Sequence, residues 1–328
     1  MRKRVLTLFM AVYLLVLLLP AIGLAQDVRV LWFPVMAGEP WFVAQDKGML
    51  AKRGIKIKAT MMWGLAKQFE AMLGNSADIA MATTLRNPME IAERIGVTPK
   101  MVYPLNWIGT FKGKYYGPQS FIVVRADSTI KKVADLKGKN IAVLDYNSLN
   151  AFILKEQLNR VGINPEREVK ILRVPLPRHE SVLISGSVHA AVMLEPFAHI
   201  ATKKGTVKVI SSNIAAIFPE DMLIAQTWTL PRFVEKNPDK LRRIQAALAE
   251  AVNFMNNPKN HPERFKILAK WTKLKMPVIS DLATSTQYFK PYPKGFTDWH
   301  LLEPQIDLFV KYGLVKKKIN ARAFDPWK

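Results

Sequence analysis

The sequence contains no cysteine among its 328 residues. That absence excludes disulfide bonds, thiolate metal sites and cysteine nucleophiles together. The five histidines form no i, i+4 pair, and no zincin motif, glycine-rich phosphate loop, dinucleotide loop or G-x-S-x-G elbow occurs. We therefore expect no metal site, no cofactor and no catalytic residues.

Long apolar runs are also scarce, and the one that stands out lies at the N-terminus. Three basic residues at 2–4 precede an apolar run over 5–19, which Pro20 ends before small residues at Gly23 and Ala25. This order is typical of a secretory signal peptide, and the run is short for a membrane span. We predict a signal peptide at 1–25, cleaved near Ala25, and a periplasmic mature protein. The alternative is an uncleaved membrane anchor.

Acidic residues are few beside basic ones, with 26 Asp and Glu against 48 Lys and Arg, so the net charge is +22. Nucleic-acid binding is one interpretation of this surplus. However, no arginine-rich arm, zinc finger or aromatic-basic RNA motif accompanies the scattered charges. We therefore favour a solvated basic surface that attracts anions, and expect no nucleic-acid partner.

Short strand patterns alternate with helix patterns along the first two thirds of the chain. Apolar runs of strand length occur at 28–33, 78–82, 140–144, 169–174 and 188–194, and amphipathic helical runs separate them. Extended segments are also predicted at 101–111, 120–125 and 222–229, with a linker at 112–118. Helices are predicted at 41–53, 65–73, 238–256, 262–273, 278–288 and 301–312. This order predicts an α/β fold whose mixed, mostly parallel sheets carry helices on both faces.

The stretch at 135–162 shows most clearly what such a fold could do. The strand at 140–144 ends in the polar loop Asp145-Tyr146-Asn147-Ser148, and a helix follows in which Ser148 or Asn147 can cap free N–H groups. A helix that begins at the carboxyl edge of a sheet presents unpaired donors and a partial positive charge. Such an edge can hold a small anion or polar molecule without a catalytic group.

Three segments resemble the substrate-binding proteins of ABC importers, in the sulfonate, nitrate, taurine and thiamine-precursor branch. The segment PWFVAQDKGMLAKRGI at 40–55 is similar to that family's P-x-x-x-A-x-x-K-G-x-F-x-x-x-G-[IL] helix. AMLGNSADI at 71–79 is similar to its A-L-x-x-G-x-A-D-I segment. The third piece combines VADLKGKNIA at 133–142 with SVHAAVMLEPF at 187–197. Their order and spacing together carry the resemblance.

The resemblance implies a type II periplasmic-binding-protein clamshell that closes around a solute and delivers it to a membrane permease. The expected lobes are 26–112 plus 220–328, with a helical C-terminal part, and 113–219. The family's ligand contacts lie in loops after the strands. Carried over to this chain, they predict a ligand-binding set of Glu39, Trp63, Gly64, Thr83, Thr84, Tyr146, Asn147, Ser148 and Glu195. A monomer is expected.

Each of these residues also has an ordinary structural interpretation. Glu39 and Glu195 could be helix-start acids, and Thr83, Thr84 and Ser148 could be helix caps. Trp63 and Tyr146 fall in polar loops and could stack on a planar ligand, whereas core packing is the alternative for aromatic residues such as Trp41.

We therefore predict a non-enzymatic solute-binding protein for a sulfonate, taurine, nitrate or related solute. One alternative is a ligand such as a thiamine-precursor pyrimidine or other planar heterocycle, because residues 32–34 resemble the W-x-P of the pyrimidine-binding branch. Two rivals are an enzyme on the same fold, which needs a convergent acid–base pair, and a ligand-sensing part of a transcription regulator, which needs a DNA-binding domain.

Overall fold

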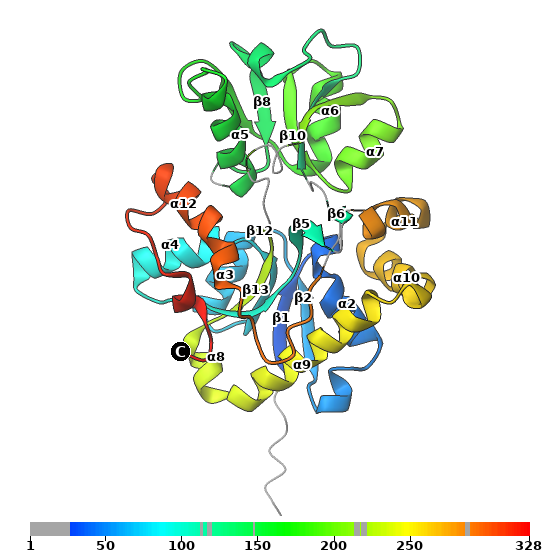
Figure 1. The fold of residues 1–328 in the computed structure, drawn as a ribbon, viewed down its shortest axis with the longest axis vertical. Helices are drawn as coiled ribbons and strands as arrows, with labels where there is room; N and C mark the ends of the chain where they lie inside the picture. Colours follow the sequence, from blue (N-terminus) through cyan, green and yellow to red (C-terminus); the bar gives the residue numbers. More distant parts are fainter. Residues whose placement is uncertain are drawn as a thin grey trace, which may run out of the picture.

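A computed structural model describes residues 27–111, 114–116, 120–146, 148–212, 217, 222–285 and 289–328. The described chain forms two five-stranded sheets with helices around each (Figure 1). We call the part built on the first sheet lobe 1 and the part built on the second sheet lobe 2. The predicted signal peptide lies outside the described residues.

The sheet of lobe 1 has the strand order β2-β1-β3-β13-β4. Strand β1 (Val28–Trp32) pairs in parallel with β2 (Ile57–Met61) and with the central strand β3 (Ile79–Thr83). β13 (Gln226–Thr229) runs antiparallel between β3 and β4 (Lys100–Pro104). The sheet is therefore mixed. Strand β13 follows lobe 2 along the chain and lies between two strands that precede lobe 2.

The helices of lobe 1 come from both ends of the chain. They are α2 (Glu39–Asp46), α3 (Leu65–Leu73), α4 (Arg86–Ile95), α8 (Pro231–Lys236), α9 (Pro238–Met255), α10 (His261–Thr272), α11 (Met276–Ser285) and α12 (Glu303–Lys311), with 3-10 turns η1 (Met36–Gly38), η2 (Ala51–Arg53), η5 (Pro258–Asn260), η6 (Trp299–Leu302) and η7 (Ala321–Phe324). One large apolar core joins them, and it extends from Val28 to Phe324. The helical C-terminal third thus packs on lobe 1.

Lobe 2 has the strand order β11-β7-β10-β8-β9. The β8–β9 and β8–β10 pairs are parallel, whereas β7 is antiparallel to β10 and β11. Two apolar clusters lie in this lobe, and both include residues of β7 and β10. Its elements are β7 (Ser120–Arg125), η3 (Val133–Leu136), β8 (Asn140–Val143), α5 (Leu149–Arg160), β9 (Lys170–Arg173), η4 (Leu176–Arg178), α6 (His179–Ile184), β10 (Ala190–Leu194), α7 (Phe197–Lys203) and β11 (Val207–Ser212).

The chain passes between the lobes twice, beside a small third sheet. That sheet joins β12 (Met222–Leu223), β5 (Trp107–Phe111) and β6 (Lys114–Tyr116). The predicted extended segments 101–111 and 222–229 are therefore each two strands, because the chain leaves one sheet for the other. Part of the predicted linker at 112–118 is strand β6. The predicted lobe boundaries fall at crossings only partly described, and they stay a prediction.

The predicted helix at 41–53 is shorter in the structure. α2 ends at Asp46, and a turn follows in which Gly48 has a φ of 66°. This left-handed conformation suits glycine and interrupts a regular helix. Within the described residues, no helix combines the length and apolar character needed to cross a bilayer.

Candidate functional site

Each large sheet has one edge, formed by the ends of its strands, that lies beside the crossings between the lobes. In lobe 1, Gln226 at the start of β13 lies opposite Thr83 at the end of β3. In lobe 2, Ser120 at the start of β7 lies opposite Leu194 at the end of β10. Ser120 and Gln226 both follow closely after a crossing, so these edges face the other lobe. The arrows of β8 and β10 accordingly point toward lobe 1 (Figure 1). We call these edges the lobe 1 rim and the lobe 2 rim.

Buried polar atoms without partners gather at the lobe 1 rim. Thr83 and Gln226 are fully buried, and Asn87 in the first turn of α4 is 4% exposed. Within the described part of the chain, Oγ1 of Thr83, Oε1 of Gln226 and Oδ1 of Asn87 have no hydrogen-bond partner. A buried polar group left unsatisfied costs about 1–3 kcal/mol. These three atoms are therefore candidates for contact with a bound solute.

The lobe 2 rim contributes Ser120 and Glu195. Ser120 is fully buried, and its Oγ also lacks a partner among the described residues. Glu195 follows β10 and is joined to Pro196 by a cis peptide bond. Its Oε2 accepts a 3.0 Å hydrogen bond from the backbone N–H of His199. Burial raises the pKa of Glu195 to about 7, so this carboxyl can either donate or accept a hydrogen bond near neutral pH.

Ser148 caps α5. Its Oγ accepts a 3.2 Å hydrogen bond from the N–H of Ala151 and donates a 2.9 Å bond to the carbonyl oxygen of Asp145. The capping interpretation therefore describes this side chain, although solute contact remains compatible with it because the other free N–H groups of the first turn are not used by the cap. The neighbouring Asn147 lies outside the described residues, and Thr84 is half-buried beside Thr83.

Two aromatic residues of the predicted site are exposed at strand ends. Trp63 follows β2 and is 55% exposed, with its ring 5.8 Å from that of Phe33. Tyr146 follows β8 and is 47% exposed. Gly64 precedes α3 with a φ of 98°, which a residue with a side chain rarely adopts. By contrast, Trp41 is buried in the core of lobe 1.

Glu39 lies in the interior of lobe 1. Its side chain is fully buried, and Oε1 and Oε2 accept hydrogen bonds of 2.5 and 2.7 Å from Nε and Nη2 of Arg264 in α10. Burial raises the pKa of Glu39, and the Arg264 guanidinium opposes that rise. Because both oxygens are engaged away from the solvent, we leave Glu39 out of the proposed ligand set.

The sequence interpretation did not include Ser120, Asn87 or Gln226. Gln226 interrupts an apolar run in the predicted extended segment 222–229, which is a usable signal, whereas Asn87 lies in a segment of mixed polarity and gives none. The pairing of Gln226 with Thr83 depends on strands 143 residues apart along the chain, a difference of 226 − 83. Two hollows are not lined by these rim residues. One is a small apolar cavity beside Trp32 and Trp271, and the other is a groove of about 510 Å³ between α5 and α12.

No group of three or more His, Asp or Glu side chains suited to a metal ion occurs in the part of the chain that the structure describes.

Comparison with known proteins gives three kinds of match. The profile of the NMT1-like family matches residues 25–269. The putative binding protein YtlA of Bacillus subtilis is 21% identical over 66% of this chain and 62% of its own length. The nitrate/nitrite binding protein NrtA of Nostoc is 22% identical over 72% of this chain and 55% of its own length. The chain thus matches less than two thirds of either relative.

Solved structures share the fold. The periplasmic aliphatic sulphonate binding protein SsuA from Escherichia coli has a TM-score of 0.70 and 22% identity, covering 90% of this chain and 96% of its own. The desulfurization enzyme DSZB has a TM-score of 0.67 and 14% identity, covering 92% and 96%. These likenesses confirm the predicted two-lobe α/β architecture of the type II periplasmic binding proteins. The same architecture therefore occurs in a binding protein and in an enzyme.

Proposed function

Because the chain belongs to the NMT1-like family, we propose that it is the solute-binding component of an ABC importer. It captures a small polar or anionic organic solute between its lobes and delivers it to a permease in the inner membrane. It is exported to the periplasm by its N-terminal signal peptide and acts there as a non-enzymatic monomer. Sulfonates, taurine and nitrate are the proposed solute class.

The observation that carries this proposal is the arrangement of polar groups on the two rims. Thr83, Asn87 and Gln226 on lobe 1, and Ser120 on lobe 2, each hold a buried polar atom without a partner in the described structure. The hydroxyls of Thr83 and Ser120 can donate hydrogen bonds to an anionic group, as can the N–H groups at the start of α5. The amide oxygens of Asn87 and Gln226 accept hydrogen bonds and therefore suit a donor group of the same solute, such as an ammonium group. Opposite rims suit a solute that stabilises the closed arrangement of the lobes.

A planar solute is the second candidate, because Trp63 and Tyr146 are exposed beside the rims on different lobes. Aromatic rings on both sides could enclose a heterocycle by stacking. Because the enzyme DSZB shares this fold, a catalysed reaction is the alternative to binding alone. A solute that dissociates chemically unchanged would support binding alone.

A thermal-shift titration tests the proposal. Purified protein is titrated with ethanesulfonate, taurine, nitrate and a thiamine-precursor pyrimidine, and sodium chloride of equal ionic strength controls for general effects on a basic protein. We expect one compound to raise the melting temperature with a saturating dependence on concentration. Native mass spectrometry of the purified protein checks for a solute retained from the cell. If no compound stabilises the protein and none co-purifies, the proposal fails.

A further inference from the structure

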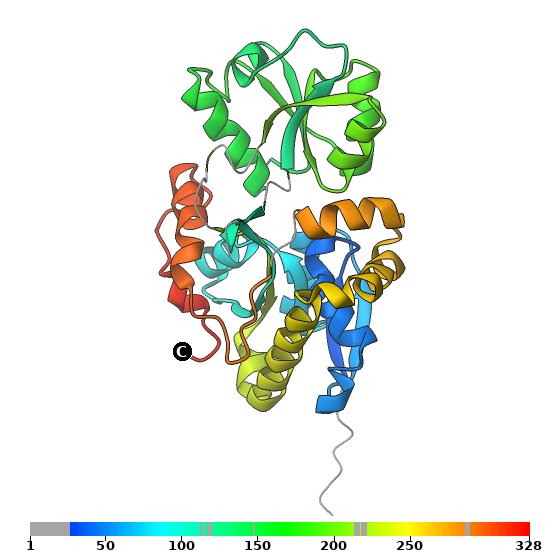
Figure 2. The same ribbon diagram turned by 45° about the vertical axis from the view of Figure 1, so that its right-hand side comes forward.

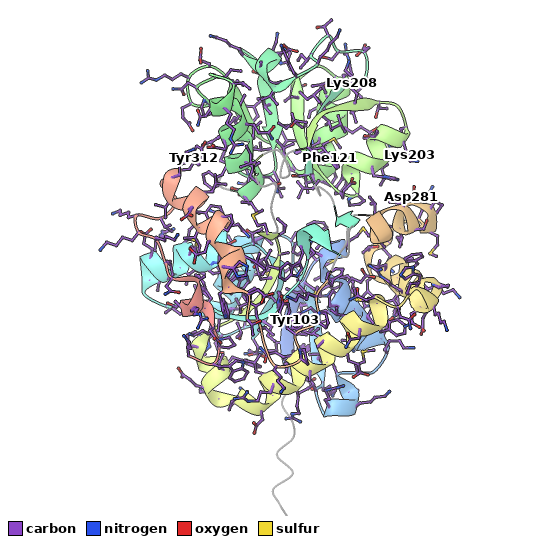
Figure 3. The ribbon with its side chains drawn as sticks, in the orientation of Figure 1. Tyr103, Phe121, Lys203, Lys208, Asp281 and Tyr312 are labelled. Atoms are coloured by element: carbon purple, nitrogen blue, oxygen red, sulfur yellow. The ribbon has the colours of Figure 1, made fainter. Side chains whose placement is uncertain are left out.

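The lobes touch along two seams on opposite sides of the molecule. At one seam α5 of lobe 2 meets α12 of lobe 1, and at the other α7 of lobe 2 meets α11 of lobe 1 (Figure 2). Tyr312 marks the α5–α12 seam, whereas Lys203 and Asp281 mark the α7–α11 seam (Figure 3). The two seams differ in their chemistry.

The α5–α12 seam has a buried apolar layer. Leu149, Phe152 and Ile153 of α5 are at most 3% exposed and belong to the core of lobe 1 rather than to that of lobe 2. The ring of Phe152 lies 5.6 Å from that of Phe309 and 5.7 Å from that of Tyr312. Separating this seam would return large apolar surfaces to water, so it resists opening.

Hydrogen bonds reinforce the same seam. Oε2 of Glu156 accepts bonds from Nζ of Lys311 at 2.6 Å and from Oη of Tyr312 at 2.9 Å. Nδ2 of Asn159 donates to Oη of Tyr312 at 2.8 Å. Ile217, which belongs to the second crossing, lines the groove between these helices beside Glu156 and Lys311. A residue of the chain segment that joins the lobes therefore lies against the seam that is harder to separate.

The α7–α11 seam is held by polar contacts of Asp281 in α11 with two residues of α7, the 18% exposed His199 and the exposed Lys203. Nε2 of His199 lies 3.3 Å from Oδ2 of Asp281, and Nζ of Lys203 lies 3.9 Å from the same oxygen. The side chains of Asp281 and Lys203 are 50% and 71% exposed. Buried residues of α7, such as Ala201, pack inside the core of lobe 2. The exposed Lys203–Asp281 charge pair is weak and is screened by salt.

We propose that the lobes pivot about the α5–α12 seam, which we call the pivot seam, and open along the α7–α11 seam, which we call the latch seam. Asp281 is the latch, the residue whose contacts hold the latch seam closed. Asp281 binds α7 through His199, whose backbone N–H donates to Glu195 on the lobe 2 rim. Asp281 and the rim carboxyl of Glu195 are therefore linked through a single residue, His199. Asp281 sets how often the molecule is open, and the α5–α12 contacts stay formed throughout.

Pulsed electron resonance between spin labels tests this, and the absence of native cysteine makes the labelling clean. One label pair, Thr202→Cys with Lys275→Cys, spans the latch seam at exposed positions. The other pair, Val161→Cys with Lys317→Cys, spans the pivot seam, also at exposed positions. Each pair is compared in the parent protein, in Asp281→Asn and in Asp127→Asn. The last is the matched control, because Asp127 is 70% exposed and pairs with Arg125 within lobe 2.

In Asp281→Asn we expect the population at long distance across the latch seam to rise about two- to five-fold, as the loss of a weak exposed charge pair allows. The distance across the pivot seam should not change, and Asp127→Asn should match the parent. About 1 M salt should open the parent and add little to Asp281→Asn. Equal widening at both seams, or no change in Asp281→Asn, would overturn the proposal. No solute is needed, so this result is independent of the proposed function.

Discussion

Arg264 donates two hydrogen bonds, of 2.5 and 2.7 Å, to the fully buried carboxylate of Glu39, 225 residues earlier in the chain. This ion pair joins α2 to α10 and so fastens the C-terminal helices to the start of lobe 1. A fully buried ion pair depends on both partners, because removal of one leaves the other charged group without compensation.

We expect Arg264→Met to lower the free energy of unfolding by about 3–5 kcal/mol. The double variant Glu39→Met/Arg264→Met should recover most of that loss, because neither charge remains buried. Urea denaturation measures both. Lys47→Ala is the matched control, since Lys47 pairs with Glu263 between the same helices but at the surface, and it should cost less than about 1 kcal/mol. Equal losses in the single and double variants would contradict a role through pairing.

Glu195 should make stability fall as pH rises. Burial raises its pKa in the folded protein to about 7, above the ordinary value of 4.5, so the folded state binds this proton more tightly than the unfolded state does. The resulting stabilisation is complete below about pH 4.5 and is lost as pH rises through about 7, by at most about 3 kcal/mol. Urea denaturation between pH 5 and pH 8 should therefore show a steeper decline in the parent than in Glu195→Gln. Parallel pH profiles would show that this carboxyl is not the source.

Thr83→Val should separate binding from stability. Its hydroxyl has no partner among the described residues, so replacing it with a methyl group should leave the free energy of unfolding equal or slightly higher. If the hydroxyl binds the solute, affinity should fall about tenfold, corresponding to the loss of one hydrogen bond. Calorimetric titration with the best stabilising compound measures this.

Thr229→Val is the matched control for that substitution. Thr229 lies at the far end of β13, and its Oγ1 donates a 2.7 Å hydrogen bond to the carbonyl oxygen of Asp78. We expect this variant to lose about 1 kcal/mol of stability and to keep full affinity. If Thr83→Val keeps full affinity and Thr229→Val loses it, Thr83 does not belong to the site.

Trp63→Ala should distinguish the two proposed solute classes. The side chain is 55% exposed, so its removal should change stability by less than about 0.5 kcal/mol. Affinity for a planar heterocycle should fall about five- to tenfold through lost stacking, whereas affinity for taurine or nitrate should stay the same. Ile95→Ala, at another exposed apolar residue, serves as the control. A loss for every compound alike would indicate a change in the rim itself.

Local patterns predicted much of the fold. Strands such as 140–144 and 188–194 were recognisable because buried strands are short apolar runs, and each is followed by a loop and a helix. The break inside 222–229 could not be seen, because Ile224 and Ala225 continue its apolar strand character. The break inside 101–111 lies between Pro104 and Trp107, so Pro104 and Asn106 were a local signal that the prediction did not use.

The site was less accessible to this reasoning. Ser148 and Glu195 were predicted because they lie in the loops after predicted strands. Glu39 also begins a helix after a strand, and nothing local distinguishes it from a rim residue, since its partner Arg264 is distant in the chain. Gln226 and Ser120 belong to antiparallel strands that start at the rims, a position that becomes visible only with the sheet order.

Capture between the lobes requires that one solute contacts both rims at once. Hydrogen–deuterium exchange with and without the best stabilising compound measures this, because exchange is read for each segment of the chain. We predict slower exchange at residues 83–87 in lobe 1 and, in the same experiment, at residues 195–199 in lobe 2. Protection confined to one lobe, with the other unchanged at saturating solute, would contradict capture between the lobes.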